Sequence, residues 1–290
     1  MREFDAQRRN TFFDQVFAPV QARDVREERE AWLHPRDRIL LERLLPGRKG
    51  IGTVLDFGCG QGRLLSELGK LGFSLIGIEP SDGMRAEAEN NCRDHPEIRL
   101  VAGGIEALEE IEDNAVDFFI AMGVFQYLGD EETATLMQAI ERVLAPGGTV
   151  IATFQNALFD LFTFNKYTLD FMMNDLLAPH ANGAEKESVE SALAGLMTRS
   201  DAPPYGEARA RDNIFVRLTN PLTQTEELRS HGWAVKGRYF YEYFGLPPLV
   251  KDAAPDTFAR IVESFEVVNA EAWQGHFMAN AFLVELERGG

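Results

Sequence analysis

Short apolar runs alternate with longer segments of helical periodicity between residues 53 and 154. This alternation is typical of a parallel β-sheet whose strands are joined by crossover helices. The strands are expected at residues 53–57, 73–78, 98–101, 116–121 and 149–154. The helices between them are expected at residues 62–70, 81–91 and 131–144.

The alternation breaks after residue 154. An aromatic-rich segment at 159–177 is followed by a polar helix at 184–197 and by a Pro- and Gly-containing loop at 203–206, a pattern that indicates an insertion. The α/β pattern then resumes, because Thr223 and Glu226 have the spacing of a capping box and predict a short helix ending at Gly232. Two further strands at 233–244 and 279–286, with a helix at 257–265 between them, complete the pattern.

These elements divide the chain into three parts. Residues 51–156 and 214–290 are expected to form an α/β core, residues 1–50 a helical arm that acts as a lid, and residues 157–213 a helical insertion that caps the substrate.

Composition indicates a globular protein. The chain has 290 residues, of which 45% are hydrophobic, enough for an ordinary buried core. No segment approaches the roughly 18 consecutive apolar residues of a membrane span, and residues 1–5 have no apolar signal-peptide core. There are two cysteines, and Cys59 lies in a glycine-rich turn where a disulfide would be awkward. We therefore expect a cytoplasmic protein without a membrane span.

Charge reduces the range of substrates. The chain has 29 basic and 46 acidic residues, for a formal charge of −17, which disfavours a nucleic-acid partner because a phosphate backbone would be repelled. The first fifty residues carry eleven Lys or Arg and nine Asp or Glu. This arm either faces an anionic small molecule or forms an amphipathic helix solvated by ion pairs along residues 23–30.

A glycine-rich turn follows the first expected strand. Asp56 ends the strand, and Gly58, Gly60 and Gly62 precede the first helix. Glycines remove side chains that would keep a ligand away from the backbone, so a nucleotide-like ligand is expected here. A dinucleotide-binding G-x-G-x-x-G motif would require glycine at the position held by Arg63.

The acid that ends the second strand adds a second element of this site. Glu79 follows Asp56 by 23 residues, at a position where a carboxylate can bind a ribose diol. With Pro80, Ser81 and Met84 it resembles the acid-Pro-Ser-x-x-Met pattern of class I S-adenosylmethionine-dependent methyltransferases, in which the methionine contacts adenine. Without the rest of the pattern, Met84 would be read as a core residue.

Two further segments extend the resemblance, which covers residues 53–154 in detail. Residues 102–108 resemble the family's Gly-Asp-Ala-Glu-x-Leu adenine segment, but Gly104 stands where the family commonly has aspartate, which leaves the base to the backbone of Gly104 and Ile105. Glu106 is either a solvated loop acid or a site residue. Residues 117–128 resemble the motif at the fourth strand, and residues 144–149 the Leu-x-Pro-Gly-Gly turn before the fifth.

The resemblance implies a Rossmann-like, seven-stranded methyltransferase fold that binds S-adenosylmethionine and releases S-adenosylhomocysteine, with no metal. The implied cofactor-binding residues are Asp56, Gly58, Cys59, Gly60, Gly62, Glu79, Pro80, Met84, Gly104, Ile105, Glu106, Met122, Gly123 and Tyr127. Gln126 and Tyr127 are expected near the reacting methyl group. The Asn/Asp-Pro-Pro-Tyr sequence of enzymes that methylate amino groups on bases is absent after the fourth strand.

The spacing of residues along the sequence identifies neither a general base nor the methyl acceptor. If a hydroxyl is methylated, the candidate bases are His34, Tyr127 and His180, with Glu106 less favoured. Segments 159–168, 220–223 and 277–282 resemble methyltransferases of bacterial surface-carbohydrate biosynthesis, which makes a sugar or nucleotide-linked sugar, methylated on oxygen or nitrogen, the leading small-molecule acceptor. A lipid-like or natural-product acceptor is the alternative.

Two other function classes remain open, with the chain a monomer or a homodimer in each. A nicotinamide-dependent oxidoreductase would share the glycine turn and Glu79, although Arg63 argues against it. A member of the fold that binds the cofactor without transferring methyl would share every motif, because methyl transfer is inferred from fold and cofactor.

Overall fold

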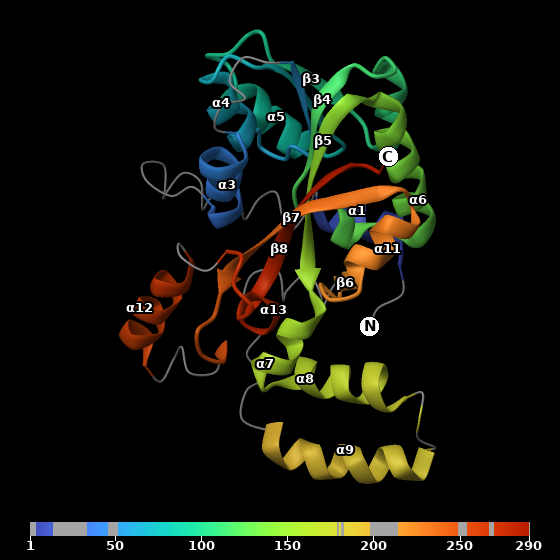
Figure 1. The fold of residues 1–290 in the computed structure, drawn as a ribbon, viewed down its shortest axis with the longest axis vertical. Helices are drawn as coiled ribbons and strands as arrows, with labels where there is room; N and C mark the ends of the chain where they lie inside the picture. Colours follow the sequence, from blue (N-terminus) through green and yellow to red (C-terminus); the bar gives the residue numbers. More distant parts are fainter. Residues whose placement is uncertain are drawn as a thin grey trace.

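A single twisted sheet organises the chain (Figure 1). The computed structural model describes residues 4–13, 34–45, 52–178, 180, 183–197, 214–248, 254–266 and 270–289. The strands are β1 (Thr53–Phe57), β2 (Ser74–Glu79), β3 (Arg99–Ala102), β4 (Val116–Ala121), β5 (Leu144–Asn156), β6 (Leu218–Thr219), β7 (Trp233–Tyr243) and β8 (Ala279–Arg288). Their order is β3-β2-β1-β4-β5-β8-β7, and the two-residue β6 pairs with β5.

The predicted α/β fold is confirmed. Strands β1 to β5 pair in parallel, and β8 pairs antiparallel with both β5 and β7. The seven expected strands are all present, with bounds within a few residues of the prediction except for β5, which begins at Leu144. The short strand β6 was not expected, because two residues carry no period-2 pattern.

Helices cover both faces of the sheet (Figure 1). The helices of the described residues are α1 (Ala6–Phe12), α3 (Pro35–Ile39), α4 (Arg63–Gly69), α5 (Asp82–Asn91), α6 (Asp130–Val143), α7 (Asp160–Thr163), α8 (Lys166–Phe171), α9 (Gly183–Met197), α11 (Gln224–Ser230), α12 (Pro255–Glu266) and α13 (Gly275–Met278). The π-helical turns are η2 (Leu40–Leu44) and η6 (Met172–Leu177), and the 3-10 turns are η3 (Ile105–Glu110), η4 (Phe125–Tyr127) and η5 (Ala157–Phe159).

Alternate side chains of the central strands divide the core in two. Val54 and Ile120 pack against leucines of α4 on one face, while Leu55 and Phe119 join Leu136 of α6 on the other. This division follows from the two-residue period of a strand, which sends neighbouring side chains to opposite faces. The carboxyl ends of the parallel strands are thereby held rigidly at one edge.

One local prediction is wrong. Helix α11 begins at Gln224 as expected, but Thr223 does not cap it, because its hydroxyl donates to the carbonyl of Asn220 at 3.4 Å. The Asn220 side chain instead accepts a hydrogen bond from the backbone N–H of Leu222. The Thr-x-x-Glu spacing therefore coincides with a helix start without forming the capping box.

The segment after β5 projects away from α4 and α5 (Figure 1). Helix α9 corresponds to the polar helix expected at 184–197, whereas the loop expected at 203–206 lies outside the described residues. The division into arm, core and insertion stays a prediction. No helix in the described part of the chain is both long and apolar enough to cross a membrane.

Candidate functional site

The turn between β1 and α4 brings backbone to the carboxyl edge of the sheet. Gly58 and Gly60 have φ angles of 73° and 56°, in the left-handed region that favours glycine. The N–H groups of Gly58 and Cys59 both donate to the carbonyl of Ile78, at 2.8 and 3.1 Å, which ties the turn to β2. A Cβ atom on Gly58 would lie 2.7 Å from the side chain of Val124, so the cradle is closed to larger residues.

Glu79 is fixed at the end of β2 by two backbone donors. Its Oε2 accepts from the N–H of Gly60 at 2.8 Å, and its Oε1 accepts from the N–H of Ser81 at 2.9 Å. Each carboxylate oxygen has two acceptor positions and can therefore accept from more than one donor. A vicinal diol supplies two such donors, which is the geometry expected for ribose binding.

The third glycine of the turn, Gly62, serves helix packing. Gly62 has φ 70°, and a Cβ atom there would lie 3.0 Å from Ala88 of α5 and from Cys92, the residue that follows this helix. It therefore allows α4 and α5 to pack closely and is not among the residues that line the cavity described below. Its predicted contact with the cofactor stays a prediction.

The carboxylate of Glu106 lies in the space that a side chain at position 104, which is glycine, would occupy. Its Oε1 accepts from the N–H of Gly104 at 2.7 Å, and a Cβ atom on Gly104 would lie 3.1 Å from its Oε2. The backbone N–H of Gly104, expected to face the adenine, thus has a partner within the chain. A carboxylate is nonetheless present at the position of the family's aspartate.

The end of β4 meets the N-terminal arm. Gly123 has φ 75° and donates its N–H to Oγ1 of Thr153 at 2.7 Å. A Cβ atom on Gly123 would lie 3.2 Å from Nη1 of Arg36, so this guanidinium reaches the same edge of the sheet as Asp56. The position of Arg36 was not predicted, because helix α3 is far from β4 in the sequence.

These groups surround a cavity of about 880 Å³, at the upper end of the range for ligand pockets. The predicted site residues that line it are Asp56, Gly58, Cys59, Gly60, Glu79, Pro80, Met84, Gly104, Ile105, Glu106, Met122, Gly123, Tyr127 and the candidate base His34. Arm residues Arg9, Asn10 and Phe13 also line it, but no residue from the described part of the insertion does. The volume is sufficient for a nucleoside and a second small molecule.

Asp56 is a carboxyl group of the cavity with a strongly shifted pKa. Burial raises its pKa to about 7, with a further increase from the charge of Asp37 and a smaller one from Glu79, while Arg36 opposes the rise. At neutral pH this carboxyl is therefore close to half protonated. A cationic ligand group beside it would favour the ionised form.

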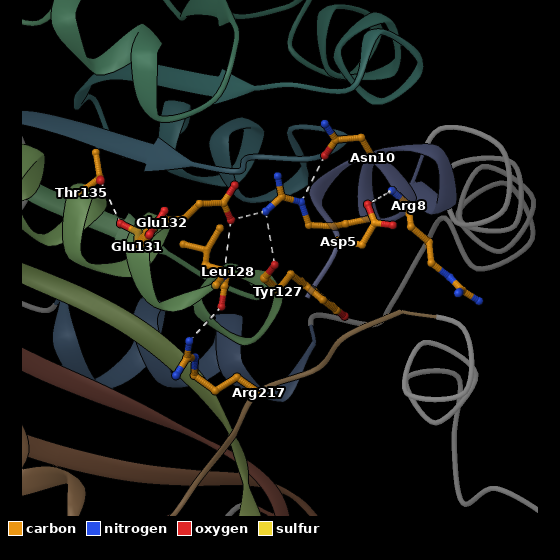
Figure 2. Close-up of polar contacts among 11 residues, drawn as sticks. Asp5, Arg8, Asn10, Tyr127, Leu128, Glu131, Glu132, Thr135 and Arg217 are labelled. Atoms are coloured by element: carbon orange, nitrogen blue, oxygen red, sulfur yellow. Dashed lines mark hydrogen bonds and ion pairs between the residues drawn. The ribbon is translucent and has the colours of Figure 1, made fainter. Parts of the chain in front are cut away.

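Two arginines hold the turn that carries Gln126 and Tyr127 (Figure 2). Arg9 of α1 donates to the carbonyl of Tyr127 at 3.3 Å and to Glu132 at 2.6 Å. Arg217 donates to the carbonyl of Leu128 at 3.1 Å, and its backbone N–H donates to the carbonyl of Gln126 at 2.7 Å. The arm and the segment after the insertion thus fix one wall of the cavity.

The candidate bases lie in different surroundings. His34 caps α3, where its Nδ1 accepts from the N–H of Arg36 at 3.3 Å, and its Nε2 lies 2.9 Å from Glu242. The ring of Tyr127 packs edge-on against Phe13 with centroids 4.9 Å apart. His180 is exposed after η6 and is not among the lining residues. Of the three favoured candidates, His34 and Tyr127 therefore line the cavity, as does the less favoured Glu106.

Several lining residues were missed by sequence reasoning. They come from the arm and from the last two strands, namely Arg9, Asn10, Arg36, Asp37, Glu242 and Asn280. No motif in the sequence marks these residues. Glu242 has an unusual backbone angle, φ 55°, but this angle is known only from the structure. No cluster of metal ligands occurs among the described residues.

Comparison with known proteins identifies the central part of the chain. Residues 55–152 match the family described as a methyltransferase domain. The human mitochondrial ubiquinone biosynthesis O-methyltransferase is 34% identical over 133 residues, covering 44% of this chain and 33% of the relative. An uncharacterized methyltransferase of Bacillus cytotoxicus is 31% identical over 132 residues, covering 46% of this chain and 58% of the relative. The chain thus spans between a third and three fifths of these curated relatives.

Similarity of fold extends over almost the whole chain. The 1,6-didemethyltoxoflavin-N1-methyltransferase of Burkholderia thailandensis, solved with its acceptor and S-adenosylhomocysteine, has a TM-score of 0.54 at 15% identity, covering 98% of this chain and 89% of that protein. This similarity confirms the predicted α/β methyltransferase fold. Residues 55–152 of the chain form a methyltransferase domain, as the motifs of the glycine turn and of Glu79 implied.

Proposed function

We propose that this protein transfers a methyl group from S-adenosylmethionine to a small molecule. The observation that carries the proposal is the Glu79 carboxylate, fixed by the N–H groups of Gly60 and Ser81 beside a closed glycine cradle. This arrangement suits a ribose whose nucleoside lies against the backbone of the turn.

The remaining groups of the cavity suit the rest of the cofactor. Met84 and Ile105 offer apolar surface to the adenine, and the Glu106 carboxylate offers an acceptor for its amine. Arg36, next to Gly123, suits the carboxylate of the methionine moiety, and the ionised form of Asp56 suits its ammonium. The cavity therefore offers a chemically matched partner to each end of the cofactor.

The chain's contribution to the reaction is mainly alignment. Bound S-adenosylmethionine supplies an activated methyl whose bond to sulfur breaks as the acceptor atom bonds to carbon, leaving S-adenosylhomocysteine and a proton lost from the acceptor. Both ring nitrogens of His34 already have partners in the chain, so it is better placed to orient Glu242 than to remove that proton. The turn held by Arg9 and Arg217 fixes the wall beside the reacting atoms.

Within the small-molecule class, we favour a sugar acceptor. The support is the resemblance of segments 159–168, 220–223 and 277–282 to carbohydrate methyltransferases, and Asn280 of the last segment lines the cavity. A cytoplasmic location belongs to the same proposal, because both cysteines are buried free thiols, as in proteins of reducing compartments.

Calorimetry with S-adenosylhomocysteine and with a nicotinamide dinucleotide tests the proposal. We expect micromolar or tighter binding of the former only, because Arg63 occupies the position of the third dinucleotide-binding glycine. Preference for the dinucleotide would refute it. A protein that binds S-adenosylhomocysteine but forms none from S-adenosylmethionine with any acceptor in a sugar, amine and phenol library would be a non-methylating member of the fold.

A further inference from the structure

Three polar side chains meet at the end of the cavity formed by β7 and β8. Oε1 of Glu242 lies 2.9 Å from Nε2 of His34, and its Oε2 accepts from Nδ2 of Asn280 at 2.8 Å. All three residues line the cavity. Because Nδ1 of His34 accepts from the backbone, Nε2 is the ring nitrogen that donates to Glu242.

This cluster lies beside the part of the cavity assigned to the methionine moiety. The charge of Arg36 acts on both Asp56 and Glu242, and its guanidinium lies at Gly123. The Glu79 end, by contrast, faces the ribose and adenine. A molecule held by Glu242 would therefore lie next to the end of the cofactor that carries the methyl group.

Glu242 is held in a costly backbone conformation. Its φ of 55° is in the left-handed region, which disfavours a residue with a side chain. It lies between the ladder pairs Tyr241–Ala281 and Tyr243–Ala279, so the distortion interrupts regular pairing at the edge of the cavity. Such strain is concentrated at functional sites, where it aims a side chain that regular strand geometry would direct elsewhere.

The carboxylate of Glu242 stays ionised at neutral pH. Burial raises its pKa, but the hydrogen bond and charge of His34, together with the hydrogen bond from Asn280, more than compensate and hold the pKa below its ordinary value. An acid with a lowered pKa is a poor proton acceptor near neutrality. Each oxygen nevertheless keeps a second acceptor position, so the group suits a ligand donor.

The cavity as a whole is acidic. Among its described lining residues, seven carry carboxyl groups and three are arginines, a formal excess of four negative charges when histidine is not counted. The cofactor, with one carboxylate, one ammonium and one sulfonium, offsets only one of them. A phosphate or carboxylate on the acceptor would thus enter a cavity that is also negatively charged, and this repulsion disfavours its binding.

We infer that Glu242, oriented by His34 and Asn280, is the specificity-determining anchor of the methyl acceptor, and that this acceptor is a neutral or cationic molecule that donates a hydroxyl or ammonium hydrogen bond. The inference rests on the proposed function and narrows its acceptor class. It favours a free or amino sugar and excludes a sugar linked to a nucleoside diphosphate.

The test uses protein saturated with S-adenosylhomocysteine and four probes that share a glucose ring: glucosamine, glucose, glucuronate and UDP-glucose. Binding is followed by ligand-observed NMR titration. We expect glucosamine and glucose to bind saturably, and glucuronate and UDP-glucose to bind at least about tenfold more weakly than glucosamine. This ranking is measured on the wild-type protein and is independent of any variant.

Glu242→Gln then tests the anchor itself. Glucosamine affinity should fall about 10- to 100-fold, as expected for loss of a charged hydrogen bond, while S-adenosylhomocysteine affinity stays within about twofold. The matched control is Glu287→Gln, which removes one charge from the same strand as Asn280 at an ion pair with Lys236 outside the cavity. Both variants are checked by thermal melting.

Three results would overturn the inference: binding of UDP-glucose or glucuronate as tight as that of glucosamine, no saturable binding of either glucosamine or glucose, or unchanged glucosamine affinity in a folded Glu242→Gln. Failure of the wild-type protein to bind S-adenosylhomocysteine is a separate outcome that refutes the proposed function.

Discussion

Binding of S-adenosylhomocysteine should strengthen as pH rises, because Asp56 must lose its proton to pair with the ammonium of the ligand. Burial, Asp37 and Glu79 raise the pKa of this carboxyl to about 7 despite the opposing charge of Arg36. At about pH 6 most of the free protein therefore carries a proton on Asp56 and is not competent to form this ion pair.

The size of the effect follows from the competent fraction. If the ligand binds only the protein whose Asp56 is ionised, the apparent affinity is lower than the intrinsic affinity by a factor of 1 + 10^(pKa − pH). This factor is about 11 at pH 6.0 and about 1.3 at pH 7.5. Affinity should thus increase about eightfold over this interval. At about pH 6.0 close to one proton should be released for each ligand bound.

Isothermal titration calorimetry in two buffers of different ionisation enthalpy measures both quantities. The control is Asp56→Asn, which cannot titrate and should bind more weakly at pH 7.5 with little pH dependence. Equal affinity of the wild-type protein at both pH values, affinity that falls as pH rises, or the same proton release in Asp56→Asn would refute the ion pair.

The same carboxyl should limit the stability of the free protein. Its pKa of about 7 is above the ordinary value of 3.8, so the folded state binds this proton more tightly and the free energy of unfolding falls as pH rises from about 4 to about 7. The difference corresponds to up to about 4 kcal/mol. Urea denaturation at about pH 8 should find free Asp56→Asn more stable than the wild-type protein, and a less stable variant would contradict this.

Three substitutions test the other cofactor contacts by calorimetry. Glu79→Ala should weaken S-adenosylhomocysteine binding at least about 100-fold, since two charged hydrogen bonds contribute about 3 kcal/mol or more, while the exposed Asp82→Ala should not; equal effects would exclude the ribose role. Arg36→Met should weaken S-adenosylhomocysteine about 10- to 100-fold but leave methylthioadenosine, which lacks the amino-acid moiety, unaffected; parallel losses would contradict carboxylate binding. Glu106→Ala should reduce the preference for S-adenosylhomocysteine over S-inosylhomocysteine about tenfold, and an unchanged ratio would remove Glu106 from adenine recognition.

Many of the predicted site residues that line the cavity are local in sequence. Asp56, Gly58 and Gly60 lie within five consecutive positions, where the end of a strand, a turn and a helix start leave few conformations for the backbone. Glu79 was found because it ends the next strand, and parallel neighbours end at the same edge. Each of these residues could be placed without knowing the rest of the fold.

Three local patterns had more than one physical use, and for one of them, the capping box, the expectation failed. Thr223 and Glu226 fit a capping box, but the Thr223 hydroxyl is engaged by Asn220. Gly62 belongs to the glycine motif, yet its lack of a side chain serves the contact between α4 and α5. Gly104 signals a missing carboxylate, which Glu106 restores from two residues further along. In each case the three-dimensional neighbours select one use.

The sequence by itself determined the α/β fold, the glycine turn and the acid that ends the second strand, because hydrophobic period and backbone chemistry act over a few neighbouring residues. Only the tertiary structure decided which distant groups complete the cavity. Arg36 reaches Gly123 from the arm, and Glu242 meets Asn280 because β7 and β8 pair antiparallel. The cluster of His34, Glu242 and Asn280 joins residues up to about 250 positions apart, whose proximity depends on how the whole chain packs.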